Sequence, residues 1–334
     1  MRALVARLDS FGDVLLAGPA VRAVAARADT VTLLCGPRGA PAARMLPGVD
    51  DVLVWDAPWA GFAPPPVDRR DTGRLLDSLA AADADTALVL TSHHQSPLPT
   101  ALLLRLAGVR RIAADSVDHP GSLLDVRHQR APHAHEAEAG LDLAVAAGFP
   151  RTDDGRLRVL PPPDTTPATG TAPYVVVHPG AAVPARAWSA GRCAGAVREL
   201  AAAGHRVVVT GGVGERGLTA YVAGGHGLDL GGRTDAAELA GVLARAAVVV
   251  TGNTGPAHLA AAVATPVVSL FAPVVPAERW RPHGVPYVLL GDQDAPCAGS
   301  RARQCPVPGH PCLETVTAQD VVTAVEKLLG EPCP

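Results

Sequence analysis

An aspartate lies at the start of a predicted helix near the beginning of the chain. In RLDSFGDVLLAGPAVRAV, residues 7–24, a buried strand ends near Leu8, Gly12 permits a tight turn, and Asp13 falls in the first helical turn. A carboxylate at that position is favoured by the helix dipole and stays ionised, so it is able to deprotonate a hydroxyl nucleophile. The alternative is that Asp13 only caps the helix and has no chemical role. Taken by itself, this motif favours the capping interpretation.

A second segment combines a glycine turn with an arginine. In VVVHPGAAVPARAWS, residues 175–189, a buried strand leads into His178, Pro179 and Gly180, and Arg186 precedes the next predicted helix. Backbone N-H groups beside a glycine turn, with a cation a few residues on, suit a phosphate group. When the segment is taken alone, an ordinary loop with a solvated arginine is the simpler interpretation.

A third segment joins two buried strands through a glycine-rich loop and a helix. In VVVTGNTGPAHLAAAVATPVVSLFAP, residues 248–273, the loop carries Asn253, Thr254 and Gly255, and His258 comes one turn into the helix. We expect Thr254 to cap the helix and the helix start to favour an anionic group. His258 either faces the same ligand or is satisfied by a neighbouring loop.

Two further loops place polar side chains directly after predicted strands. In TGGVGE, residues 210–215, Gly212 belongs to a glycine turn, and Glu215 is suited to accept hydrogen bonds from ribose hydroxyls, as acidic residues do in dinucleotide folds. In TSHHQS, residues 91–96, His93, His94 and Gln95 are expected at the carboxyl edge of a sheet, where loops carry function. They either contact an acceptor substrate or only cap local backbone groups.

The elements that position these residues alternate between strands and helices. We expect strands at 4–8, 31–35, 52–55, 86–90 and 111–114, with helices at 14–26, 40–46, 73–82 and 99–106. The alternation resumes with strands at 174–178, 206–210, 247–251 and 267–271, and helices at 189–203, 235–245 and 255–264. This pattern predicts an α/β protein with parallel sheets.

A Pro- and Thr-rich stretch divides the two series. Residues 161–173 offer little apolar surface to bury and predict a linker, so domains are expected at 1–160 and 174–334. A chain of 334 residues also exceeds the size at which single hydrophobic cores usually stop growing. Two doubly wound, Rossmann-like domains would face each other across a cleft that binds ligands.

Composition narrows the class of protein. With 48% apolar and 18% charged residues the chain is globular, and its net charge of −3 offers no basic footprint for nucleic acid. No apolar run is long enough to span a membrane, and Asp9 and Asp13 interrupt any signal sequence, so we expect a cytoplasmic protein. The six cysteines are expected as reduced thiols.

The ordered set of motifs resembles glycosyltransferase family 9, the heptosyltransferase-like enzymes. GDVLLAGPA, HPGA with a later R-A-W-S, GGVGE, LGGRTDAAELAGVLARA and GNTGPAHLAAAVATPVVSLFAP follow one another in the order and spacing of that family over nearly the whole chain. The resemblance implies a GT-B fold, with the acceptor bound by the first domain and a nucleoside-diphosphate sugar, typically ADP-heptose, bound by the second. It also implies inversion at the anomeric carbon without a metal or other cofactor.

The resemblance also implies roles for particular residues. Asp13 corresponds to the general base, Arg186 to a phosphate-binding lysine, and Glu215 to a ribose contact. The expected donor-binding residues are His178, Gly180, Arg186, Gly212, Glu215, Asn253, Thr254, Gly255 and His258, and the expected acceptor-binding residues are Gly12, His93, His94 and Gln95.

Two positions depart from the family pattern. Asn253 stands where the family usually has aspartate, and Arg186 where it commonly has lysine. Arginine keeps the charge in a planar, forked form, and asparagine keeps an acceptor oxygen without the charge. Lys327 is the only lysine among 29 basic residues, so Arg186 reflects either codon bias or a changed diphosphate contact.

Two candidate metal motifs are set aside. Asp83 with Asp85 and Asp292 with Asp294 each spell D-x-D, but both pairs fit solvated turns better than a cation site. Cys297, Cys305, His310 and Cys312 could supply zinc ligands, yet they lack the close C-x-x-C pairs of common structural sites. We therefore predict no metal.

The predicted activity is an inverting, metal-independent transfer of a heptose or related sugar from an ADP-linked donor to an acceptor hydroxyl. The acceptor is a sugar-bearing small molecule or an envelope glycan, and peripheral contact with a membrane is left open. The alternatives are a catalytically silent sugar-nucleotide-binding protein, a GT-B-type nucleotide-sugar epimerase, and a scaffold whose cleft is structural.

Overall fold

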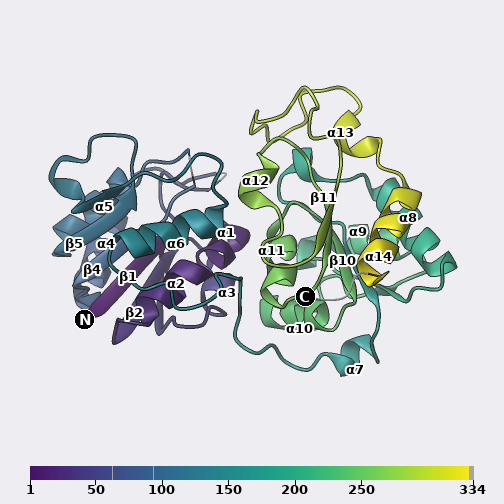
Figure 1. Cartoon of the computed structure of the whole chain (residues 1–334), viewed down its shortest axis with the longest axis horizontal. Coiled ribbons are helices and arrows are strands. Elements are labelled where there is room, and N and C mark those ends of the chain that lie inside the picture. The colour runs from purple at the N-terminus through teal and green to yellow at the C-terminus, as the bar shows by residue number, and fades with distance from the viewer. Residues whose placement is uncertain (62, 93, 331–334) are drawn as a thin grey trace. The chain divides into compact units, whose positions relative to one another are not determined.

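A computed structural model describes residues 1–61, 63–92 and 94–330. The chain forms two compact units, one comprising Met1–Leu160 and the other beginning at Pro161. Figure 1 shows each unit as a sheet covered by helices. No described helix has both the length and the apolar composition that crossing a bilayer requires.

The first unit alternates strands and helices as the sequence predicts. Its elements, with η for a 3-10 helix, are β1 (Arg2–Arg7), α1 (Phe11–Leu16), α2 (Gly18–Ala25), β2 (Thr30–Cys35), α3 (Ala40–Ala43), β3 (Asp51–Val54), α4 (Arg69–Ala82), β4 (Thr86–Val89), α5 (Leu98–Leu106), β5 (Arg111–Asp115), η1 (Gly121–Leu123), β6 (Val126–His128) and α6 (Glu136–Ala146).

The first sheet is entirely parallel, with strand order β3-β2-β1-β4-β5-β6. Helix α2 packs against α6, whereas α4 packs against α5. The buried side chains Leu75 and Leu79 of α4 share a core cluster with Leu4 and Ala6 of β1. Alternate residues of a strand face opposite sides of the sheet, and helices cover both of these faces. The winding reverses between β1 and β4, where the strand order changes direction.

The predicted helix over residues 14–26 is wrong in its extent. The structure has two helices, α1 and α2, joined at Ala17, and Pro19 lies in the first turn of α2. Proline has no backbone N-H and is tolerated in a first helical turn, so the chain restarts a helix there. Gly12 does not form the expected tight turn, because it lies inside α1 one residue before Asp13.

The second unit repeats the plan with more elements than the sequence predicts. They are α7 (Thr166–Thr169), β7 (Val175–His178), η2 (Pro184–Arg186), α8 (Ala190–Ala202), β8 (Val207–Val209), η3 (Val213–Glu215), α9 (Arg216–Ala223), β9 (Leu228–Asp229), α10 (Ala236–Ala244), β10 (Val248–Gly252), α11 (Gly255–Ala262), β11 (Val267–Leu270), α12 (Ala277–Trp280), β12 (Tyr287–Leu290), α13 (Pro311–Glu314) and α14 (Ala318–Gly330).

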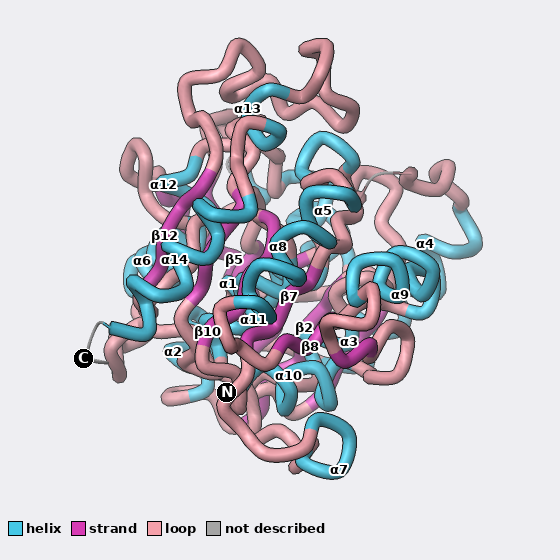
Figure 2. Tube along the Cα trace, turned by 90° about the vertical axis from the view of Figure 1, so that its right-hand side faces the viewer, coloured by secondary structure: helices cyan, strands magenta, loops and turns pink. Residues whose placement is uncertain are grey.

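The second sheet is also parallel, with order β12-β11-β10-β7-β8-β9. Its central strands are runs of buried valine, as expected for strands covered on both faces. Helix α8 packs against α9 and α14, and α10 packs against α11 (Figure 2). The winding reverses between β7 and β10, so the predicted α/β class with two doubly wound sheets is confirmed.

The stretch from 161 to 173 is more ordered than its composition suggests. It contains the single-turn helix α7, and Thr169 at the end of this helix is fully buried. Pro163 lies against α10 within the second unit, since a Cβ at Gly241 would come within 2.4 Å of the Pro163 carbonyl oxygen. The segment therefore packs onto α10 of the second unit.

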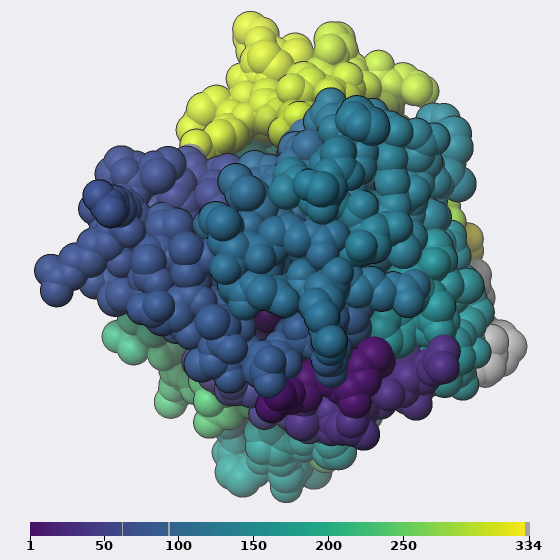
Figure 3. Space-filling view, turned by 90° about the vertical axis from the view of Figure 1, so that its left-hand side faces the viewer, coloured from purple at the N-terminus to yellow at the C-terminus, as the bar shows by residue number. Residues whose placement is uncertain are grey.

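Exposed apolar side chains of the first unit come from separate segments. They include Val54 on β3, Val67 in the loop before α4, Leu102 and Leu106 one turn apart on α5, and Val117 in the loop after β5. Figure 3 shows one face of this unit, coloured purple to blue-green. Single exposed apolar residues are usual on protein surfaces. They give no separate support to peripheral membrane contact.

Candidate functional site

The predicted residues of the second unit gather where its winding reverses. His178 ends β7, Gly252 ends β10, and the loops that follow carry Arg186 and Asn253. Because β7 and β10 are neighbouring parallel strands, both loops leave the same edge of the sheet. In open α/β sheets this edge, at the reversal point, is where ligands bind.

A row of buried polar side chains runs beneath these loops. His178, Thr251 and Ser269 are paired in register on β7, β10 and β11, so they lie on one face of the sheet. Nδ1 of His178 lies 2.9 Å from Oγ1 of Thr210, which directly follows β8. Burial lowers the pKa of His178, and the nearby Glu215 carboxylate opposes this only in part, so the imidazole is neutral near pH 7.

Thr251 and Ser269 were not predicted as site residues. Both are fully buried, and neither hydroxyl oxygen has a hydrogen-bond partner among the residues that the structure describes. Their sequence signal is weak, because a single hydroxyl near the end of a valine-rich strand is common in ordinary cores.

Glu215 lies directly against Gly180. A Cβ at Gly180 would come within 2.0 Å of Oε1 of Glu215, so only glycine leaves room for this carboxylate. The backbone N-H of Gly212 donates to Oε2 of Glu215 at 2.7 Å, which fixes the turn η3. The structure therefore brings Gly180, Gly212 and Glu215 together, with His178 close enough for Glu215 to influence its charge.

The loops of Arg186 and Asn253 are also in contact. A Cβ at Gly252 would lie 3.1 Å from the Arg186 carbonyl oxygen, so the turn η2 packs on the end of β10. Asn253 is buried, its Nδ2 donates to the carbonyl of Ala272 at 3.2 Å, and its Oδ1 accepts from the Ala272 N-H at 3.3 Å. This side chain joins the loop after β10 to the segment after β11.

The start of α11 follows the expected positions but not the expected cap. Thr254 is the N-cap residue and Gly255 begins the helix, yet the Thr254 side chain makes no capping hydrogen bond. Its hydroxyl instead lies 3.5 Å from the carbonyl oxygen of Gly252. His258, on the first turn of α11, is buried.

The cysteine-bearing segment supports the turn that carries Arg186. The N-H of Ala185 donates to the Arg303 carbonyl at 3.0 Å, and Nε2 of His310 donates to the Ala185 carbonyl at 3.2 Å. Within residues 1–61, 63–92 and 94–330, no three His, Cys, Asp or Glu side chains are arranged to hold a metal ion. The five described cysteines are free thiols.

The two D-x-D pairs have local partners. Asp85 accepts from the N-H of Arg2 at 2.9 Å and pairs with Arg110 at 2.6 Å, at the amino end of β4. That end is opposite to the carboxyl edge where ligands bind. Asp292 accepts from the N-H of Asp294 at 2.9 Å, as in an ordinary turn.

In the first unit, Asp13 is held by β1 and by its own helix start. Nη2 of Arg7, the last residue of β1, donates to Oδ1 of Asp13 at 3.2 Å. The hydroxyl of Ser10 donates to Oδ2 at 2.6 Å, and the Ser10 N-H lies 3.3 Å from the same atom. Asp13 is therefore both a helix-capping residue and a partly exposed carboxylate at the carboxyl edge of the sheet.

Asp9 shares the same arginine. Its Oδ2 lies 3.1 Å from Nε of Arg7, and Nε2 of Gln95 donates to its Oδ1 at 2.6 Å. Burial raises the pKa of Asp9 to about 6, although the Arg7 guanidinium acts in the opposite direction. Gln95 also accepts from the N-H of Ser92 at 3.0 Å, so its amide joins the loop after β1 to the loop after β4.

The remaining predicted acceptor residues are Gly12, His93 and His94. His94 is exposed on the loop after β4. His93 lies outside the described residues. Gly12 is buried within α1 next to Asp13. Of the predicted set, the structure brings Gln95 into the hydrogen-bonded group around Asp9 and Arg7.

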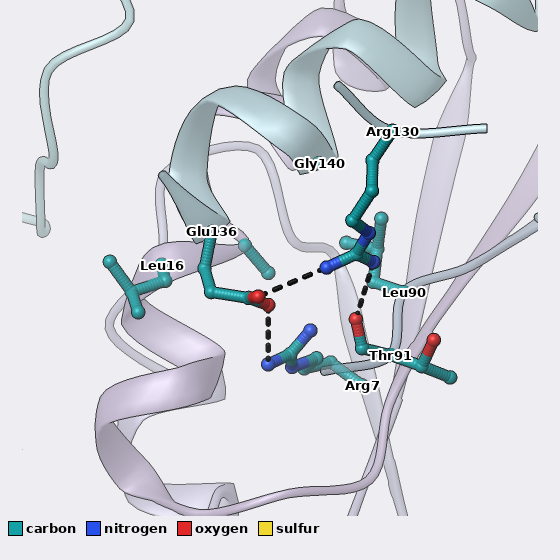
Figure 4. Close-up of a pocket in the computed structure, with 8 residues that line it drawn as sticks. Arg7, Leu16, Leu90, Thr91, Arg130, Glu136 and Gly140 are labelled. Carbon is teal, nitrogen blue, oxygen red and sulfur yellow. Dashed lines mark hydrogen bonds and ion pairs between the residues drawn. The ribbon is translucent and has the colours of Figure 1, made fainter. Parts of the chain in front are cut away.

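Sequence reasoning missed the buried ionic network behind Asp13. Figure 4 shows Glu136, at the start of α6, between Arg7 and Arg130. Nη2 of Arg130 also donates to the Thr91 carbonyl at 2.8 Å. These residues line a small cavity of about 10 Å³ beneath the carboxyl edge, a volume sufficient for at most one water molecule. The sequence feature that could have indicated this network is Arg7, a charged residue at the end of an apolar strand.

Comparisons with known proteins identify the family and the fold. Residues 72–310 match the family model for glycosyltransferase family 9 (heptosyltransferase). Lipopolysaccharide heptosyltransferase 3 of Escherichia coli is 30% identical over 165 residues, which are 47% of this chain and 47% of the relative. The match thus spans about half the length of this curated relative.

Two solved structures share the fold over almost their whole length. A glycosyltransferase family 9 protein from Veillonella parvula has a TM-score of 0.77 at 18% identity, covering 98% of this chain and 97% of that one. The E. coli heptosyltransferase WaaC with ADP-2-deoxy-2-fluoro heptose has a TM-score of 0.69 at 20% identity, with 98% and 99% covered. The two sheets therefore form a GT-B fold.

Proposed function

The chain belongs to glycosyltransferase family 9, and on this premise we propose that it transfers a heptose or related sugar from an ADP-linked donor to an acceptor hydroxyl, with inversion and without a metal. The glycosyltransferase class follows from the family. The donor is proposed because a family relative, WaaC, has been solved with an ADP-heptose analogue. The acceptor is proposed as a sugar-bearing small molecule or an envelope glycan, and the enzyme as cytoplasmic.

The donor is proposed to bind at the carboxyl edge of the second sheet. The observation that carries this proposal is the contact of three loops there, through Gly180 with Glu215 and through Gly252 with Arg186. Glu215 offers carboxylate oxygens to ribose hydroxyls. Arg186 and the N-terminal end of α11, at Thr254 and Gly255, offer positive charge to the diphosphate.

The remaining predicted donor residues are proposed to shape that edge. Neutral His178 offers one ring nitrogen to a ligand while Nδ1 contacts Thr210. Asn253 is proposed to hold its loop through Ala272, which occupies both its amide nitrogen and its oxygen. His258 is proposed to contact the sugar or the diphosphate from the first turn of α11.

The proposed reaction is a single displacement. Asp13 accepts the proton of the acceptor hydroxyl, whose oxygen forms a new bond to the anomeric carbon. The bond from that carbon to the diphosphate oxygen breaks, and ADP leaves with the electron pair while Arg186 offsets its negative charge. Attack opposite the leaving group inverts the anomeric centre. Gly12, His93, His94 and Gln95 are proposed to line the acceptor side.

Binding and turnover separate this proposal from the alternatives. A thermal-shift series with ADP, UDP and GDP is expected to show stabilisation by ADP, about 2.7 kcal/mol at 100 times its dissociation constant. Mass spectrometry of reactions with ADP-heptose and a panel of glycosides should then detect ADP and a product heavier by one heptosyl unit. Binding without ADP release would indicate a silent binding protein. A sugar of changed configuration on intact ADP, detected by proton NMR because epimers have equal mass, would indicate an epimerase. No shift with any nucleotide would indicate a scaffold.

A further inference from the structure

Arg7 is a single buried cation shared by three carboxylates. Its side chain is 5% exposed, and it lies 3.1 Å from Asp9, 3.2 Å from Asp13 and 3.6 Å from Glu136. Asp9 comes from the loop after β1, Asp13 from α1, and Glu136 from α6. A guanidinium has a fixed number of N-H donors, so an N-H group that bonds to one carboxylate is unavailable to the other two.

Glu136 is itself held in place from the far side. Its side chain is 1% exposed, and Nη1 of Arg130 lies 3.0 Å from Oε1, while Oε2 faces Arg7 (Figure 4). Arg130 is fixed by Asp115, at 2.8 Å, and by the Thr91 carbonyl, at 2.8 Å. Asp115 in turn contacts Nδ1 of His128. A continuous chain of contacts thus runs from β6 to Asp13.

The charges in this chain do not balance. Four carboxylates, those of Asp9, Asp13, Asp115 and Glu136, face two guanidinium groups, those of Arg7 and Arg130, and the His128 imidazole beside Asp115 adds at most one further positive charge. An excess of buried negative charge makes protonation of one member easier. The raised pKa of Asp9, whose principal cause is burial and to which Asp13 and Glu136 contribute, is consistent with this excess.

We propose that Glu136 and Arg130 are positioning residues for the transfer reaction, in which Glu136 competes with Asp13 for Arg7 and Arg130 limits that competition. The balance sets how strongly Arg7 holds the Asp13 carboxylate, and hence how readily Asp13 accepts a proton. This inference rests on the proposed function, because it takes Asp13 as the general base.

The two residues should act in opposite directions. Glu136→Gln removes a negative charge near Arg7, so Arg7 holds Asp13 more strongly and Asp13 titrates at lower pH. Arg130→Gln frees Glu136 to neutralise Arg7, so Asp13 titrates at higher pH. Each shift is expected to be about 0.5 to 1 pH unit. General structural damage has no reason to produce shifts of opposite sign.

The test is a carbon-13 NMR titration of the full-length protein labelled at the aspartate carboxyl carbons. The Asp13 signal is identified by its loss in Asp13→Asn. Titration midpoints are compared for wild type, Glu136→Gln, Arg130→Gln and the double variant, which should fall within about 0.3 units of wild type if the two changes offset each other. Asp153→Asn is the matched control, since it breaks the Arg22–Asp153 pair in the same unit and shares no residue with the network.

The outcomes distinguish this inference from the proposed function. Midpoints that move in opposite directions support the positioning role, and midpoints that stay within about 0.2 pH units of wild type, or move together, overturn it. If one single variant fails to fold, the other still decides, because each has its own predicted direction. Loss of ADP release in Asp13→Asn bears on the base assignment separately, since the NMR titration requires no turnover. Where turnover is measurable, the acid limb of kcat/KM should follow the midpoints.

Discussion

The side-chain amide of Asn253 is hydrogen-bonded through both of its polar atoms to the backbone of Ala272. Nδ2 donates to the carbonyl at 3.2 Å, and Oδ1 accepts from the N-H at 3.3 Å. An aspartate at this position would accept from the N-H but would turn its second oxygen towards a carbonyl. The departure from the aspartate expected in the family thus has a local structural reason in this chain.

This relationship predicts that Asn253→Asp destabilises the protein more than Asn253→Ala does. The aspartate buries a charge and sets it against the Ala272 carbonyl, for an expected loss of about 3 kcal/mol in the free energy of unfolding, against about 1–2 kcal/mol for alanine. Urea denaturation at pH 7 measures both. Equal stability of Asn253→Asp and wild type would show that the two hydrogen bonds to Ala272 are not both important.

A second prediction concerns Gly180. Replacing it with alanine places a Cβ within 2.0 Å of Oε1 of Glu215, so the carboxylate must leave its position. If Glu215 contacts the donor ribose, ADP should bind at least about tenfold more weakly, which corresponds to a loss of about 1.4 kcal/mol. Calorimetric titration with ADP measures this. Gly217→Ala is the control, because a Cβ there meets no atom within 4 Å. Unchanged ADP affinity in Gly180→Ala would remove Glu215 from the donor site.

The raised pKa of Asp9 predicts how stability depends on pH. Its folded-state pKa of about 6 exceeds the ordinary value of 3.8, so between these values the folded protein holds a proton that the unfolded chain has released. The free energy of unfolding should therefore fall as pH rises from about 4 to 6, by up to about 3 kcal/mol from this group. Asp9→Asn should lack that contribution.

Urea denaturation of wild type and Asp9→Asn at pH 4.5 and 7 tests this dependence. Between pH 4.5 and pH 7, wild type should lose more unfolding free energy than Asp9→Asn does, so the variant gains stability relative to wild type at the higher pH. Asp118→Asn, a change at an exposed aspartate, serves as the control. A difference that stays constant across the window would show that Asp9 titrates alike in the folded and unfolded chain.

Thiol reactivity offers a fourth prediction. Burial raises the pKa of Cys35 to about 11 and that of Cys193 to about 12, whereas Cys305 is only partly buried. Since the thiolate is the reactive form, iodoacetamide at pH 8 should modify Cys305 at least about 100-fold faster than Cys193. Peptide mass spectrometry over time measures the rates, with urea-unfolded protein as the control. Protection of Cys305 that a chelator reverses would instead indicate a bound metal.

The sequence predicted the α/β class and the edges of the sheets that carry the polar loops. Valine-rich strands followed by glycine turns are local signals, and they placed His178 and Asn253 at strand ends correctly. The ionic network around Arg7 depends on Glu136, 129 positions away in the chain, and no periodicity reports such a contact. The two hydrogen bonds between Asn253 and Ala272 likewise form only after β10 and β11 pair. The predicted helix over residues 14–26 is wrong in its extent because Pro19 fits the start of a new helix as well as it breaks the interior of a helix.

The proposed sugar transfer from a nucleoside-diphosphate donor requires Asp13 as its general base. The decisive measurement is the rate of ADP release from ADP-heptose, with the acceptor that supports the fastest release, by wild type and by Asp13→Asn of verified fold. We predict release by wild type and a rate at least about 100-fold lower in Asp13→Asn, with ADP binding retained. Release by Asp13→Asn at the wild-type rate would show that Asp13 is not the general base.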